Sequence, residues 1–374
     1  MLTSRACPGF NLLKKRTREL FKKILICHAE RSEASRFFPI VNEETLRFAQ
    51  GDITIMETNM KNPNPAFGAH LEPFHGIPSF MRLPVTRDLQ GVQVAIAGLP
   101  FDSGASFRSG ARFGPRAIRQ ASLLLWGYNA VLGVAPLDQL AVVDYGDLEV
   151  IPVDIRASNE GIARQAGEIL AQDVTLIGLG GDHSVSLPLL RAHAAKYGPL
   201  AVLQLDSHPD TWQEEFSGQA YSHGTPFRRA IEEKLIEPGA YLQVGIRGPT
   251  SGAHDLEDAR QLGARLMTIG QVFEQGVPAV LQTIHQSIGA RPLYVSLDID
   301  CVDPAFAPGT GTPEVGGLSS HQILELVRGL QGLNLVGLDL VEVCPAYDAG
   351  EITSILAANL VFEFLSLLAL KKKD

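Results

Sequence analysis

Acidic and histidine side chains with metal-binding spacing occur in residues 201–210, AVLQLDSHPD. The mostly apolar start of this segment is typical of a short strand buried on both faces, and Asp206, His208 and Asp210 follow it two residues apart. An extended chain would point all three side chains the same way. Clustered carboxylates in a buried place are normally tolerated only when cations neutralise them. The segment therefore predicts a site for a divalent ion such as manganese, zinc or nickel, although a polar turn after a strand also fits this segment alone.

Three further apolar segments, residues 175–184, 292–303 and 335–343, end in the same kinds of side chain. The residues concerned are Asp182, His183, Asp298, Asp300 and Glu342. Ligands of open parallel sheets bind at the carboxyl ends of the strands, which is where these residues are expected. Four strand-like segments with such ends predict one shared site.

Six of these residues are candidate metal ligands: His183, Asp206, His208, Asp210, Asp298 and Asp300. One tetrahedral ion cannot use so many ligands. Shared between two ions roughly 3.5–4 Å apart, with carboxylates bridging, they predict a two-metal hydrolytic site. Such ions lower the pKa of a bound water and stabilise charge in the transition state. The residues thus predict hydrolysis without naming the bond.

The composition narrows the class of protein. Of 374 residues, 45% are hydrophobic and 20% are charged, so the chain can bury a large core. The net charge of −9 argues against a nucleic-acid binder. The four cysteines have no CxxC spacing, which makes a reducing cytoplasm the simplest location. No apolar stretch is expected to reach the roughly 18 residues that span a membrane, and the run at 360–370, which contains Glu363, predicts a terminal core helix.

Strand-like and helix-like segments alternate from residue 92 onward. Besides the four segments above, strands are expected at 92–99, 140–148, 241–248 and 265–269, and helices from about 116 and at 155–173, 186–197, 277–288, 319–329 and 352–368. This alternation implies right-handed βαβ crossovers, and therefore a mostly parallel sheet covered by helices on both faces.

The ends of the chain suggest how it is divided. We expect residues 91–374 to form a single catalytic domain, preceded by a Pro/Gly-rich segment at 56–90. Residues 1–55 carry ten Lys/Arg against six Asp/Glu, unlike the acidic remainder. A basic amphipathic helix at 11–25 would suit a transit peptide or a surface anchor. We nevertheless expect residues 1–55 to be disordered or not part of the natural protein.

Several long motifs carry a resemblance to a known family. GGDHS, DSHPD, SHGTPF, SLDIDCVDPAFAPGTGTPEVGG and DLVEVCPAYD, spread over residues 78–368, resemble the ureohydrolases, the arginase and agmatinase group. The resemblance implies a three-layer αβα arginase-like fold with a binuclear metal site at the carboxyl ends of the strands. It implies two divalent ions, manganese in most members, with nickel or cobalt as alternatives. The implied reaction is hydrolysis of a guanidino group to urea and an amine.

The resemblance also implies roles for individual residues. His183, Asp206, Asp210 and Asp298 would hold one ion, and Asp206, His208, Asp298 and Asp300 the other. His223 matches the proton-shuttling histidine, and Glu342 matches the carboxylate that grips the guanidinium. Asp210 would also accept a hydrogen bond from the attacking hydroxide. A guanidinium carbon is a poor electrophile in water, so such orientation and proton transfer are needed.

The substrate follows less directly from the sequence. Agmatine, which would give putrescine and urea, is the expected substrate, with 4-guanidinobutyrate or 3-guanidinopropionate as alternatives. Glu214 and Glu215 would favour the distal amine of agmatine if they face the pocket, whereas Arg108 would favour a guanidino acid. A non-catalytic metal-binding regulator of polyamine metabolism is a further alternative. We expect a homo-oligomer, a trimer or hexamer, that binds neither nucleic acid nor a membrane.

Overall fold

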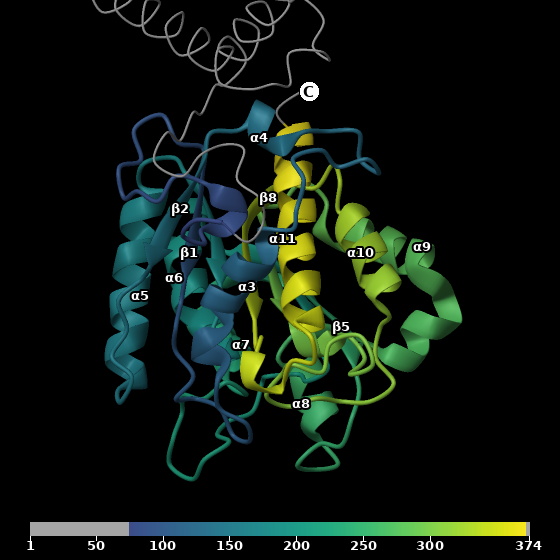
Figure 1. Ribbon diagram of the computed structural model, residues 1–374. Helices are drawn as coiled ribbons and strands as arrows, with labels where there is room; N and C mark the ends of the chain where they lie inside the picture. Colours follow the sequence, from purple (N-terminus) through teal and green to yellow (C-terminus); the bar gives the residue numbers. More distant parts are fainter. Residues whose placement is uncertain (1–74, 372–374) are drawn as a thin grey trace, which may run out of the picture. The chain divides into compact units, whose positions relative to one another are not determined.

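The computed structural model describes residues 75–371, which surround one eight-stranded sheet (Figure 1). The strands are β1 Val94–Gly98, β2 Val142–Asp147, β3 Thr175–Leu179, β4 Leu200–Leu205, β5 Ile236–Ile246, β6 Ala264–Thr268, β7 Leu293–Asp298 and β8 Leu335–Val341. All neighbouring strands pair in parallel, in the order β2-β1-β3-β8-β7-β4-β5-β6. Every residue of β4, β7 and β8 is buried, as expected for central strands covered on both faces.

Helices cover both faces of the sheet and make it the middle of three layers. The helices are α3 Gly114–Ser122, α4 Pro136–Gln139, α5 Ile155–Leu170, α6 Ser186–Tyr197, α7 Pro226–Glu232, α8 Asp255–Gln261, α9 Ile269–Ile288, α10 Ser320–Arg328 and α11 Ile352–Lys371. One buried apolar cluster includes side chains of α3, α9, α10 and α11, and a second includes those of α5, α6, α7 and α8. In Figure 1, α11 lies beside α3 and α10, which it contacts. The predicted three-layer fold with a parallel sheet is confirmed.

Short 3-10 helices lie between the longer elements, and η3 and η4 come shortly after β3 and β7. They are η1 Phe80–Arg82, η2 Ala111–Phe113, η3 His183–Val185, η4 Ile299–Cys301 and η5 Pro345–Tyr347. Two of them, η3 and η4, begin directly after aspartates whose side chains accept hydrogen bonds from the backbone of the turn. These local bonds let the backbone leave the strand without losing its partners.

Some expected boundaries are wrong. Helix α9 begins at Ile269, whereas the sequence predicts a start at residue 277. The helix consists of two pieces joined by a turn at Gly276, which has a φ of +76°. The sequence shows Gly276 and Pro278 as breakers, so only the second piece was predicted. Helix α8 was not predicted at all. The expected extension at residues 1–55 and most of the 56–90 segment lie outside the described residues, and the proposed division into domains stays a prediction.

Helix α11 corrects the expectation that no apolar stretch approaches membrane-spanning length. By length and composition alone it could cross a membrane, since its mean hydropathy is 1.9. However, 83% of that apolar window is buried inside the structure, as in a core helix. Its acidic residue, Glu363, is paired with Arg328 and accepts a hydrogen bond from Asn129. The predicted core helix is therefore present, and it extends to Lys371.

Candidate metal centre and active site

The acidic and histidine residues singled out from the sequence meet at the carboxyl ends of four adjacent strands. Asp298 is the last residue of β7, and Asp206 follows β4 directly. Glu342 follows β8, and His183 opens η3 beyond β3. Because the sheet order contains β3-β8-β7-β4 as neighbours, these residues share one edge.

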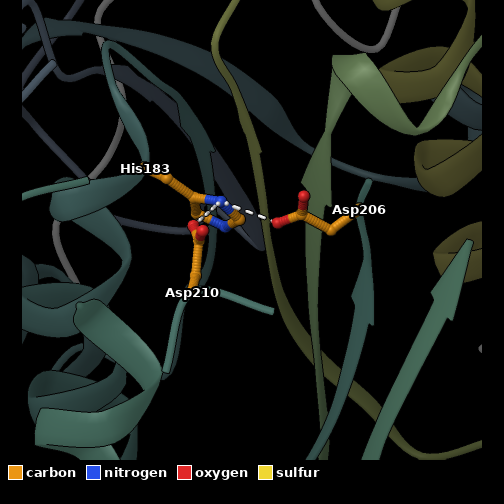
Figure 2. Close-up of side chains that lie close together, drawn as sticks. All are labelled: His183, Asp206 and Asp210. Atoms are coloured by element: carbon orange, nitrogen blue, oxygen red, sulfur yellow. Dashed lines mark ion pairs between the residues drawn. The ribbon is translucent and has the colours of Figure 1, made fainter. Parts of the chain in front are cut away.

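The first group of side chains that could hold a metal ion is His183, Asp206 and Asp210, all of them buried (Figure 2). The Nδ1 atom of His183 lies 2.9 Å from Oδ2 of Asp210 and 3.1 Å from Oδ2 of Asp206. Oδ2 of Asp298 is 3.2 Å from the same nitrogen. One imidazole nitrogen and three carboxylate oxygens thus surround a single small space.

The second group that could hold an ion is Asp206, His208 and Asp300. Nδ1 of His208 lies 2.9 Å from Oδ2 of Asp300 and 3.8 Å from Oδ1 of Asp206. Asp206 belongs to both groups, with one oxygen toward each histidine. Five of the six predicted ligands therefore form two adjacent groups that share a carboxylate, and the sixth, Asp298, lies beside His183 of the first group.

The donor set fits two cations. Nδ1 of His183 and Oδ2 of Asp300 are buried and make no hydrogen bond, although Oδ2 of Asp210 lies 2.9 Å from the first atom and Nδ1 of His208 lies 2.9 Å from the second. Burial, and then the charges of Asp210 and Asp300, raise the pKa of Asp206 to about 7. Divalent cations would give the free atoms a partner and remove the repulsion between the carboxylates.

His183 is held from behind by a hydrogen-bond relay that the sequence did not predict. Nε2 of His183 is 2.9 Å from Oγ of Ser296, and that hydroxyl donates to Oδ1 of Asp339 at 2.6 Å. Tyr294 donates its hydroxyl to the other oxygen of Asp339 at 2.7 Å. Ser296 and Asp339 are register partners on β7 and β8. An acid inside the otherwise apolar β8 was the available signal.

This relay gives a testable prediction for metal affinity. Replacing Asp339 with Asn should weaken metal binding by about 10- to 100-fold, because the relay orients His183 with Nδ1 toward the metal site. Calorimetric titration with manganese would measure the change. The Tyr294→Phe variant removes only the outermost hydrogen bond and should show a smaller loss. Unchanged affinity in Asp339→Asn would contradict the assigned relay.

His223 and Glu342 contact each other beside the metal groups. Nδ1 of His223 is 2.9 Å from Oε1 of Glu342, which also accepts a hydrogen bond from the backbone N–H of His183. The second oxygen, Oε2, is buried and has no partner. Glu342 has a φ of +64° and Asp210 a φ of +49°, conformations that are uncommon for non-glycine residues and cluster at functional sites.

A pocket of about 290 Å³ opens above this site. Its lining includes His208, Asp210, Asp298 and His223, together with Glu214 and Glu215. Glu342 is not among the lining residues, but it contacts His223, which is.

Arg108 does not line the pocket. Its guanidinium lies over the ring of Tyr347, 4.7 Å from the centroid. Among the described residues that line the pocket there is no Lys or Arg, so its charged groups are acids and histidines. Of the two opposite expectations, the structure places Glu214 and Glu215 in the pocket lining and does not place Arg108 there.

Comparison with known proteins identifies relatives that are named as guanidino hydrolases. The profile of the Arginase family matches residues 92–366. A guanidinopropionase from Pseudomonas aeruginosa is 44% identical over 308 residues, 82% of this chain and 96% of that protein. An agmatinase from Chromobacterium violaceum is 44% identical over 315 residues, 82% of this chain and 93% of that protein. A solved structure described as a hypothetical agmatinase from Burkholderia thailandensis is 44% identical, with a TM-score of 0.77 over 84% of this chain and 98% of that chain.

The family match covers most of the chain, and it includes the ends of β3, β4 and β7, beside which the possible metal ligands lie, and the end of β8, which Glu342 follows. The fold, the gathering of possible metal ligands beside β3, β4 and β7, and the similarity to named ureohydrolases agree with one another. The chain belongs to the arginase family.

Proposed function

We propose that this protein hydrolyses the guanidino group of a small substrate to urea and an amine, with two metal ions held by the six strand-end residues. The observation that carries the proposal is the pair of metal-binding groups sharing Asp206, next to a glutamate with a buried, unpartnered oxygen. A non-catalytic regulator is disfavoured, because neither the ligands nor the residues proposed for catalysis are missing.

Each residue beside the metal groups has a role that its position supports. Bound ions would supply a water of lowered pKa and offset negative charge in the transition state. Oε2 of Glu342 is the acceptor that a guanidinium N–H would fill, and the resulting charge-assisted bond would orient the substrate. Asp210 lines the pocket and can accept a hydrogen bond from the attacking water. His223, at the pocket wall, can carry the proton that the leaving amine needs.

For the metal we propose manganese, with nickel or cobalt as alternatives. The ligands are carboxylate oxygens and imidazole nitrogens without a thiolate, a set that several divalent ions accept. The buried free thiols of Cys301 and Cys344 accord with the proposed reducing cytoplasm.

For the assembly we propose a homo-oligomer, a trimer or hexamer. Exposed large apolar side chains such as Phe107, 71% exposed, and Trp126, 88% exposed, support contacts between copies of the chain.

Agmatine is the substrate that the pocket supports best. Its far end is a primary ammonium, and the pocket offers Glu214, an exposed acid, but no Lys or Arg among the described lining residues. A guanidino acid would place a second carboxylate in this acidic pocket, near Glu214, which is unfavourable. The similarity to a guanidinopropionase nevertheless makes guanidino acids the second candidate class.

Competing substrates test this assignment. With the manganese-loaded protein, kcat/KM for agmatine should exceed that for 4-guanidinobutyrate or 3-guanidinopropionate by at least about tenfold, the effect of one favourable charge contact. Glu214→Gln should reduce this preference, whereas Glu274→Gln, on the exposed surface of α9, should leave it unchanged. A preference for a guanidino acid would transfer the assignment to the second class.

A further inference from the structure

Glu215 lies beside His223 in the loop between β4 and α7. Its Oε1 is 3.3 Å from Nε2 of His223, and its Oε2 accepts a hydrogen bond from the backbone N–H of Gly224 at 3.3 Å. The Glu215 side chain is 19% exposed, and it lines the pocket together with His223. Glu214, its neighbour in the same loop, makes its hydrogen bond elsewhere, with Gly218.

The same nitrogen of His223 has a second partner, in the loop that follows β1. The backbone N–H of Ser106 donates to Nε2 at 3.1 Å, and the Ser106 hydroxyl lies 2.8 Å away. A ring nitrogen accepts a hydrogen bond only when it carries no proton, and it donates only when it carries one. Nε2 thus faces a fixed donor in Ser106 and a fixed acceptor in Glu215.

The other ring nitrogen of His223, Nδ1, has one partner, a carboxylate oxygen of Glu342. Nδ1 of His223 lies 2.9 Å from Oε1 of Glu342, and a carboxylate oxygen needs a donor, so Nδ1 carries a proton. The neutral ring then fits Ser106 through the lone pair of Nε2. The protonated ring fits Glu215 through a new N–H at the same atom. Neither state requires the ring to flip.

We propose that Glu215 is a positioning residue that, together with the Ser106 backbone, holds His223 in one orientation in both of its protonation states. When His223 gains or loses its proton, only the Nε2–H bond forms or breaks. The electron pair of that bond stays on the ring when the proton leaves for the pocket. This inference rests on the proposed proton-carrying role of His223, and it assigns Glu215 to the histidine and not to the substrate amine.

The charges around His223 favour the protonated ring. Glu342 faces it from the end of β8, Glu215 from the β4–α7 loop and Asp182 from the end of β3. Burial alone would lower the pKa of His223, but the hydrogen bonds and charges of Glu215 and Glu342 outweigh it and raise this pKa well above its usual value. Of these acids, Glu215 can be changed without touching Glu342 or a residue next to a metal ligand.

A purely structural role for Glu215 makes a different prediction. Through Gly224, the carboxylate also ties the loop to the turn before α7. If that were its whole role, its neutral amide analogue would loosen the loop without changing the proton affinity of His223. Measuring the proton affinity of His223 in Glu215 variants therefore distinguishes the positioning role from a purely structural one.

The test is an NMR titration of the full chain labelled with ¹³C at histidine Cε1 and loaded with diamagnetic zinc. The His223 signal is the one missing from the His223→Asn spectrum. In Glu215→Gln its midpoint should fall by about one pH unit or more, a tenfold loss of proton affinity, because an adjacent negative charge has been removed. Glu215→Asp keeps the charge and should restore most of the shift.

Glu214→Gln is the matched control, since it removes the neighbouring charge from the same loop and should titrate like the wild type. Equal midpoints for Glu215→Gln and Glu214→Gln would overturn the proposal, as would a failure of Glu215→Asp to recover. Because the titration needs no substrate, a protein that released no urea would refute the proposed function without affecting this result.

Discussion

Replacing Glu342 with Gln is expected to lower kcat/KM for urea release by about a thousandfold while leaving the bound metal in place. The amide keeps the size of the side chain but loses the negative charge that would bind the guanidinium through charge-assisted hydrogen bonds. It also weakens the contact with Nδ1 of His223. Steady-state urea assays and the metal content of the purified variant measure the two effects separately.

The control for this variant is Glu325→Gln, which changes an exposed acid of α10 and should keep wild-type activity. If Glu342→Gln with metal bound kept more than about a tenth of the wild-type kcat/KM, a guanidinium-binding role would be contradicted. A loss of less than about tenfold is smaller than the free energy of one charged hydrogen bond.

Replacing Asp298 with Asn is expected to weaken metal binding by at least about 100-fold and to remove activity with it, since losing a ligand costs more than losing a supporting residue. Asp298 lies 3.2 Å from Nδ1 of His183, and its side chain also accepts a hydrogen bond from the backbone of Asp300. The metal content after dialysis against a limiting chelator, with urea release at saturating manganese, measures the loss.

Without metal, the same Asp298→Asn variant should be more stable to heat than the wild type. Burial, and then the charges of Asp300 and Asp206, raise the pKa of Asp298 well above its ordinary value of 3.8. An acid with a raised pKa in the folded state costs stability once the pH exceeds its unfolded pKa. Metal-free Asp298→Asn should therefore melt above the metal-free wild type at neutral pH, and the gap should shrink toward pH 4. A lower Tm at neutral pH would contradict this account of the repulsion.

Much of the site could be read from the sequence because strand ends and ligands coincide. An apolar run that stops at Asp206 or Asp298 reveals both a strand and the edge where it ends. The alternation of strands and helices then makes the sheet parallel and brings such ends together. His223 was found differently, through the resemblance of SHGTPF to a family motif.

The residues that support the site could not be read in the same way. Ser296 and Asp339 are 43 positions apart and meet only because β7 and β8 pair in one particular register. The directions of Glu215 and Arg108 depend on loop conformations that residue types do not determine. Arg108 turned out to lie over Tyr347, a contact that no local pattern indicates.

The most direct test of the central claim is urea release by the full-length chain loaded with manganese, measured across agmatine, 4-guanidinobutyrate, 3-guanidinopropionate and arginine. We predict urea from at least one of these compounds, with agmatine preferred, together with an equal amount of the matching amine and loss of the reaction after chelation. No urea from any of them, by a protein shown to contain two metal ions, would contradict the assignment of a guanidino hydrolase.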